Sequence, residues 1–86
     1  MIAVRPNLRS VVDHDGAIIL DIDRDLFISM NPIGAYIWER LVKGDTSEDI
    51  AATIASDTGS NISIVSADVA EFMADLKDKH LIELHA

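Results

Sequence analysis

Three aspartates at alternate positions, Asp21, Asp23 and Asp25, are the side chains in this sequence that most resemble a metal site. Alternating acids open calcium-binding loops, which also need a glycine at the sixth position and a glutamate at the twelfth. Counted from Asp21, these positions hold Leu26 and Pro32. Because aspartate is also a favoured turn residue, the segment is predicted to be a polar turn between two strands.

The other residues that could do chemistry do not form a recognisable motif. His14, His80 and His85 lack the three- or four-residue spacing that would place two imidazoles on one helical face. There is no cysteine, no G-x-S-x-G sequence and no glycine-rich phosphate loop. We therefore predict no catalytic residue, no bound metal and no cofactor, and so a protein that is not an enzyme.

Length and composition indicate one globular domain spanning residues 1–86. The chain is 49% hydrophobic and 26% charged, which is typical of a folded protein. Its longest apolar run, "AIIL", is far shorter than the roughly 20 residues that cross a membrane. The N-terminus lacks the apolar core of a signal peptide, so a cytoplasmic protein without a membrane partner is expected.

The charge of the chain argues against nucleic acid as a partner. Its formal net charge is -8, with 7 basic and 15 acidic residues. Proteins that bind nucleic acid need lysine and arginine to replace the counterions on phosphate. The basic residues here are scattered along the sequence, so neither DNA nor RNA is expected as a partner.

The first third of the chain is predicted to form three antiparallel strands at 8–13, 17–22 and 26–30. Each is rich in β-branched or apolar residues, and Asp15-Gly16 is a turn signal between the first two. Since strands that follow one another in an antiparallel meander pair with each other, the first and third strands should be its edges.

Three helices should follow. The first is capped by Asn31, with Pro32 in its first turn, and ends before Gly44. It carries Trp38, which shares a face with Leu41 and should be buried between this helix and the sheet. The fold class is thus α+β, with three strands followed by three helices.

The second helix should be capped by Thr46 or Ser47, and the segment 58–61 should end it. The third helix is the longest, with Ser63 or Ser66 as its cap. The final "LIEL" is predicted to be a short extended tail.

The third strand, "LFISM", has an unusual pattern for a sheet edge. Leu26, Ile28 and Met30 share one face, and Phe27 and Ser29 share the other. Edge strands are normally protected by lysine, proline or inward-pointing charges, and this one contains none. Such an edge is either an aggregation liability or a docking site.

The third helix carries a wide apolar stripe. Such a stripe is usually core, although a methionine also suits surfaces that accept varied partners. The stripe consists of Val65, Val69, Phe72, Met73 and Leu76.

Three motifs in order resemble the PqqD-like family. The hairpin motif D-G-x-x-x-L-D occupies residues 15–21, and a Met-Asn-x-x-Gly-Ala-x-Ile-Trp motif runs from Met30 to Trp38. The third motif, Asp-Val-x-x-Phe-x-x-x-Leu, runs from Asp68 to Leu76. Together they cover nearly the whole chain, and the Asn-Pro joint is most similar to that of free-standing members from lasso-peptide pathways.

The resemblance implies a winged helix-turn-helix fold and a role as a recognition element, or peptide chaperone, for ribosomally made and modified peptides. The leader of a precursor peptide would add as a strand to the third strand and pack on the third helix, and a separate leader peptidase would receive it. The implied peptide-binding residues are Leu26, Phe27, Ile28, Ser29, Met30, Val69, Phe72, Met73 and Leu76.

The sequence is also compatible with other interpretations of the partner and the function. The partner enzyme could instead be one that modifies the peptide, as in the pyrroloquinoline quinone pathway. The fold alone would also suit a DNA-binding winged helix, which the charge opposes. The unprotected edge could pair with a second copy of the chain and form a homodimer.

Overall fold

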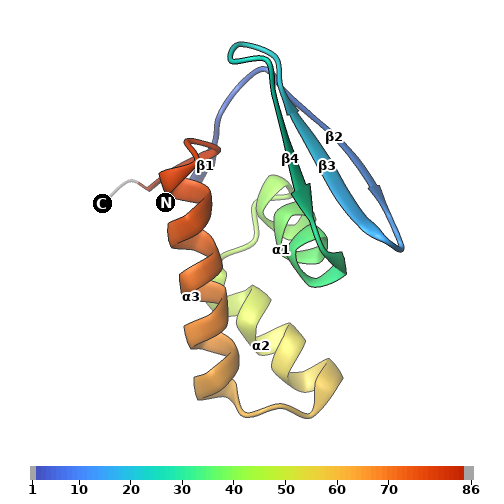
Figure 1. The fold of residues 1–86 in the computed structure, drawn as a ribbon. Helices are drawn as coiled ribbons and strands as arrows, with labels where there is room; N and C mark the ends of the chain where they lie inside the picture. The colour runs from blue at the N-terminus through green and yellow to red at the C-terminus, as the bar shows by residue number, and fades with distance from the viewer. Residues whose placement is uncertain (1, 85–86) are drawn as a thin grey trace.

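Three antiparallel strands and then three helices follow one another in the chain, as the sequence predicts (Figure 1). The computed structural model describes residues 2–84. The strands are β2 (Leu8–Asp13), β3 (Gly16–Asp21) and β4 (Leu26–Met30), and the helices are α1 (Pro32–Val42), α2 (Ser47–Thr58) and α3 (Ile62–Asp78). The sheet order is β2-β3-β4, so β2 and β4 are its two edges, which confirms the predicted meander.

The two ends of the described chain form a second sheet that the sequence analysis missed. Strand β1 (Ile2–Val4) pairs with β5 (Ile82–Leu84) in an antiparallel register, with Val4 opposite Ile82. The predicted extended tail is therefore a paired strand, and Ile82 is buried. A three-residue strand is too short to show a period, and its partner lies at the other end of the chain. Local pattern could not reveal this pairing.

The hairpin between β2 and β3 depends on Gly16. This residue has a φ of +138°, in a region that side chains disfavour. A Cβ at position 16 would also collide with the carbonyl oxygen of Met30 at the end of β4. Glycine therefore both forms the turn and lets β4 approach β3 closely.

Helix α1 begins as predicted. The side chain of Asn31 accepts a hydrogen bond from the backbone N–H of Gly34 (2.8 Å), and Pro32 occupies the first turn. Thr46 caps α2 by accepting a bond from the N–H of Asp49 (3.1 Å). Gly59 then ends this helix in the left-handed conformation.

The predicted start of α3 is wrong. Its cap is Asn61, which accepts a hydrogen bond from the N–H of Ser63 (2.8 Å), rather than Ser63 or Ser66. The apolar residues of the first turn, Ile62 and Ile64, are exposed, so the buried stripe starts a turn after the helix does. Asparagine caps a helix as well as serine does. The prediction took the start of the helix from the start of its apolar stripe and therefore placed the cap too late.

The core lies where α1 packs against β3 and where α2 packs against α3. Trp38 is 2% exposed and belongs to the same apolar cluster as Ile19 of β3, which confirms its predicted burial. Its indole N–H is buried without a hydrogen-bond partner among the described residues. The other large members of the cluster include Ile37, Leu41, Ile50, Val69, Met73, Leu76, Leu81 and Ile82.

Residues 2–84 contain neither a helix that could span a membrane nor a cluster of metal-ligating side chains. None of the helices in this range is long and apolar enough to cross a membrane. Within the same range, no group of three histidine or acidic side chains is placed to hold a metal ion. His85 lies outside the described residues.

Candidate functional site

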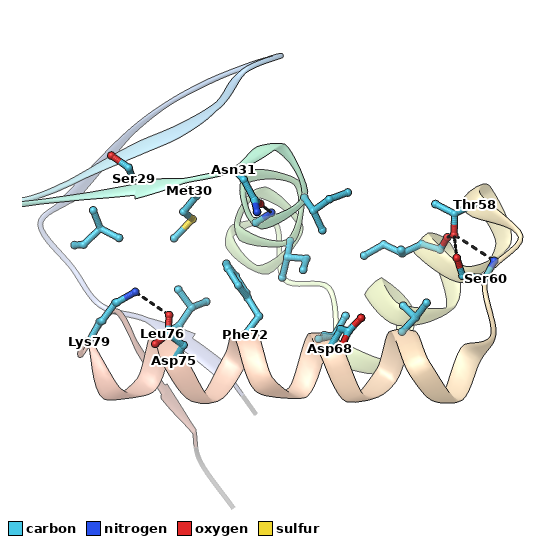
Figure 2. A pocket seen from close by; sticks show the side chains of 17 residues that line it. Ser29, Met30, Asn31, Thr58, Ser60, Asp68, Phe72, Asp75, Leu76 and Lys79 are labelled. Carbon is cyan, nitrogen blue, oxygen red and sulfur yellow. Dashed lines mark hydrogen bonds and ion pairs between the residues drawn. The ribbon is translucent and has the colours of Figure 1, made fainter.

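A groove of about 410 Å³ runs along α3, between this helix and the edge strand β4 (Figure 2). We call it the β4–α3 groove. At one end it is bounded by β4, and towards the other end by the start of α1 and the end of α2. Its apolar lining consists of Ile28, Met30, Ile33, Gly34, Ile37, Ile54, Val65, Val69, Phe72 and Leu76.

The main chain of β4 has unpaired groups on the side that faces this groove, and the register identifies them. The N–H of Ile22 bonds to the carbonyl of Asn7 (3.1 Å), so the backbone of Ile22 faces the β2 side of the sheet. Along a strand, successive residues turn their backbone groups to opposite sides. Residues 17, 19 and 21 of β3 therefore bond towards β4, where they lie opposite Met30, Ile28 and Leu26.

It follows that Phe27 and Ser29 present their N–H and C=O groups to the free edge of β4. The position of the Met30 carbonyl against Gly16 agrees with this assignment, since it turns the backbone of Met30 towards β3. Ile28 likewise bonds inward, so a proline at this position would damage the sheet itself. Phe27 and Ser29 are the residues through which another strand could pair.

The side chains of β4 divide between the two faces of the sheet as the alternation predicts. Met30 points from β4 towards α3, whereas Ser29 points away (Figure 2). Ile28 and Met30 are half-buried and contact the core cluster. Leu26 and Phe27 are exposed and do not line the groove. The five predicted residues of the strand are thus brought to the edge together, but in different roles.

The predicted residues of α3 also divide. Val69, Phe72 and Leu76 line the β4–α3 groove. Met73 is buried and lies instead beside a second hollow, near Leu41 and the start of α2. A charge at Met73 would therefore disturb the packing of the helices, and we leave this residue out of the proposed site.

Gly34 and Phe72 are fitted to each other at the middle of the groove. A Cβ at Gly34 would lie 3.0 Å from the nearest ring carbon of Phe72, closer than an ordinary van der Waals contact. Phe72 projects from α3 towards the joint between β4 and α1 (Figure 2). The glycine of the Asn-x-x-Gly motif thus gives the Phe72 ring its position beside the strand.

A hydrogen-bonded link fixes the end of the groove nearest the start of β4. Arg24, in the turn before β4, donates to the carboxylate of Asp21 (2.6 Å) and to the carbonyl of Lys79 after α3 (2.5 Å). Arg5 donates to the neighbouring carbonyl of His80 (3.0 Å). Cations at a helix C-terminus are favourable, so this link holds the turn before β4 against the end of α3.

Asp21 is the charged residue that anchors this link. It is 1% exposed, and the side-chain hydrogen bond from Arg24 holds the pKa of Asp21 below its ordinary value, although burial opposes this shift. The first acid of the "DIDRD" segment is therefore structural. This outcome agrees with the turn that was preferred to a calcium loop.

The open side of α3 next to the groove is acidic. Asp68, Glu71, Asp75 and Asp78 follow one another along a single exposed strip of the helix beside Phe72. Lys79 pairs with Asp75 (2.7 Å) and neutralises one of these charges. An acidic ligand entering the groove would meet unfavourable charge along this side.

Sequence analysis missed several residues of the groove. Ile33, Gly34, Ile37 and Ile54 line it from α1 and α2, and Arg24 fixes one end. Ile33 is exposed in the structure, but the sequence shows only an isoleucine in the first turn of a helix, which does not distinguish a groove position from a core position. The role of Arg24 depends on a contact with a distant carbonyl and leaves no local pattern.

Comparison with solved structures shows that this fold is shared. TbiB1 in complex with the TbiA(beta) leader peptide matches with a TM-score of 0.89 and 23% identity, covering 98% of each chain. A lasso peptide synthetase B1 complexed with its leader peptide matches with a TM-score of 0.86 and 22% identity, covering 96% of this chain and 98% of that one.

A third match is the solution structure of the PqqD truncation of Methylobacterium extorquens PqqCD, described as a stand-alone recognition element for ribosomally synthesized and modified peptides. Its TM-score is 0.77 with 19% identity, over 96% of this chain and 88% of that one. No curated protein sequence matches the chain. The family model of coenzyme PQQ synthesis protein D (PqqD) matches residues 16–82, which include β3, β4, all three helices and the β4–α3 groove. This chain therefore belongs to the PqqD family.

Proposed function

We propose that residues 1–86 form one recognition domain that binds the leader segment of a ribosomally made precursor peptide. The leader adds as a fourth strand to the free edge of β4, and alternate side chains enter the β4–α3 groove. The domain carries out no chemistry itself. It presents the precursor to a separate enzyme, a leader peptidase of a lasso-peptide pathway.

The observation that carries the proposal is the position of the unpaired backbone of β4. Phe27 and Ser29 offer donors and acceptors along an apolar edge, and the groove beside it is lined by Val69, Phe72 and Leu76. An extended peptide satisfies both features at once, because its backbone completes the ladder while its side chains cover the apolar lining.

The proposal of a lasso-peptide pathway rests on the structural similarity of this chain to two leader-peptide complexes. Two of the solved structures that share this fold are complexes with leader peptides, one of a lasso peptide synthetase. Their TM-scores are higher than that of the PqqD truncation. The Asn31-Pro32 joint favours the same branch of the family.

DNA binding is disfavoured by the surface of α3. In a DNA-binding winged helix this helix would approach phosphate, yet its exposed strip carries Asp68, Glu71, Asp75 and Asp78. A second copy of this chain could compete with the peptide for the free edge of β4. A homodimer through β4 would cover the same edge that the peptide needs.

Nuclear magnetic resonance of the isotope-labelled protein tests the proposal. The ligands are synthetic leader segments of lasso-peptide precursors and of the pyrroloquinoline quinone precursor. We expect the amides of Phe27 and Ser29 and those of the α3 groove residues to shift, while those of β2 stay in place. Absence of any shift, or shifts centred on β2, would contradict the proposed site.

Three further measurements test the delivery step, the pathway and self-pairing. A lasso-pathway leader peptidase should cleave its precursor faster when this chain is present, and the Phe72→Ala variant should not support that effect. Tighter binding of the pyrroloquinoline quinone leader would instead reassign the pathway. A dimer in light scattering that dissociates when peptide is added would identify self-pairing through the same edge.

A further inference from the structure

The face of the sheet that points away from the helices carries an exposed apolar patch. Phe27 is 75% exposed, Val11 72% and Ile18 52%. The buried Ile19 lies on the opposite face, against α1. The register joins the exposed residues into two rows, in which Phe27 lies opposite Leu20, and Ile18 lies between Val11 and Ser29. We call the four apolar residues of this face, Val11, Ile18, Leu20 and Phe27, the outer patch.

Phe27 is the member of the outer patch that lies on β4, the edge strand beside the β4–α3 groove. Its backbone faces outward, so a strand that pairs with β4 has one residue beside Phe27. The side chain of that residue lies on the same face as the Phe27 ring, with Cβ atoms about 5 Å apart. The next residue of the strand turns to the other face, towards the groove.

We propose that Phe27, backed by Leu20 and Ile18, forms an outer subsite for an aromatic or β-branched side chain of the bound peptide. This inference rests on the proposed function and specifies its ligand. Recognition is two-sided, so the peptide has apolar residues at two adjacent positions, one on the groove and one on Phe27. An alternating apolar and polar pattern, which a groove alone would select, does not satisfy both faces.

The surroundings of Phe27 decide which side chains suit the subsite. The nearest groups on this face are Leu20 across the ladder and Ser29 two positions along the strand. Arg9, the charged residue of the same row, lies on β2 and is separated from the added strand by three strand spacings, about 14 Å. The position beside Phe27 is therefore apolar, and the position beside Ser29 tolerates polar side chains.

Selection from a displayed random peptide library tests the inference. The parent, Phe27→Thr, Phe27→Tyr and Val11→Thr are each used as the immobilised protein, after circular dichroism confirms that they are folded. Threonine preserves strand propensity, tyrosine preserves the ring, and Val11 is the matched control on the same face but at the other edge strand.

The parent and Val11→Thr should enrich peptides with two adjacent apolar positions. Phe27→Thr should lose one of these positions and bind the parent-selected peptide about two- to tenfold more weakly, whereas Phe27→Tyr should keep both. The inference is overturned if Phe27→Thr enriches the same two positions, or if the parent enriches an alternating pattern. If the parent enriches no peptide, the proposed function itself fails, and the inference fails with it.

Discussion

The two edges of the sheet, β2 and β4, are alike in pairing but differ in what lies beside them. Both leave alternate backbone groups unpaired: Ser10 and Val12 on β2, and Phe27 and Ser29 on β4. β2 contains the exposed charges Arg9 and Asp13. β4 contains none and opens onto the β4–α3 groove. We infer that β4 is the edge suited to binding a peptide, whereas the charges on β2 protect that edge from pairing.

Both edge strands belong to a sheet that packs on one core. The largest predicted effect therefore comes from disrupting this core, which destabilises both edges. Trp38→Ala should lower the free energy of unfolding by about 3–5 kcal/mol, as other large aromatic truncations in cores do. Trp38→Phe should cost less, because it also removes a buried N–H that has no partner. Denaturant unfolding measures both. A Trp38→Ala variant as stable as the parent would show that this core is misplaced.

Neighbouring residues of α3 separate stability from binding. Met73→Ala should destabilise the fold by about 2–5 kcal/mol, because Met73 is buried among the helices. Phe72→Ala, in the half-buried groove position, should chiefly weaken peptide binding, by about 1–3 kcal/mol. Chemical denaturation and titration calorimetry measure the pair. A Met73→Ala variant that keeps the stability of the parent but loses affinity for the peptide would contradict this division of roles.

Narrowing the groove should produce a smaller change. Gly34→Ala gains helix propensity, about 0.5–1 kcal/mol, but forces the Phe72 ring to move. We expect stability near that of the parent and weaker peptide binding. In the Phe72→Ala background the same substitution should leave affinity unchanged, and a double-mutant cycle measures this coupling. Additive effects of the two substitutions would separate Gly34 from the ring.

Low pH should have the smallest effect on stability. It should act through Asp21, which holds the Arg24 link beside β4. Because the pKa of Asp21 is lowered in the folded chain, its carboxylate stabilises the fold above about pH 4, near the unfolded value. This contribution is lost as the pH falls through the folded pKa. Thermal unfolding of the parent should therefore depend more steeply on pH below 4 than that of Asp21→Asn. Equal slopes would contradict the role of the Arg24 link.

The sequence predicted the elements better than their contacts. The meander, the Asn31 cap and the burial of Trp38 follow from turn residues, capping preferences and helical spacing, which are local rules. The β1–β5 pair and the bond from Arg24 to Lys79 join distant segments, and no local rule specifies them. At the site, spacing placed Phe72 and Met73 on one stripe. Adjacent helical positions lie about 100° apart, so two residues of one stripe can face different cavities.

A pair of matched proline substitutions tests the central claim most directly. Ser29→Pro and Ser10→Pro each remove one outward N–H from an exposed serine in an edge strand, and neither removes a ladder bond. Titration calorimetry with a leader peptide that binds the parent, on variants with unchanged circular dichroism, compares them. We expect Ser29→Pro to weaken binding about ten- to a hundredfold, whereas Ser10→Pro should bind as the parent does. Equal affinities of the two variants would contradict strand addition at β4.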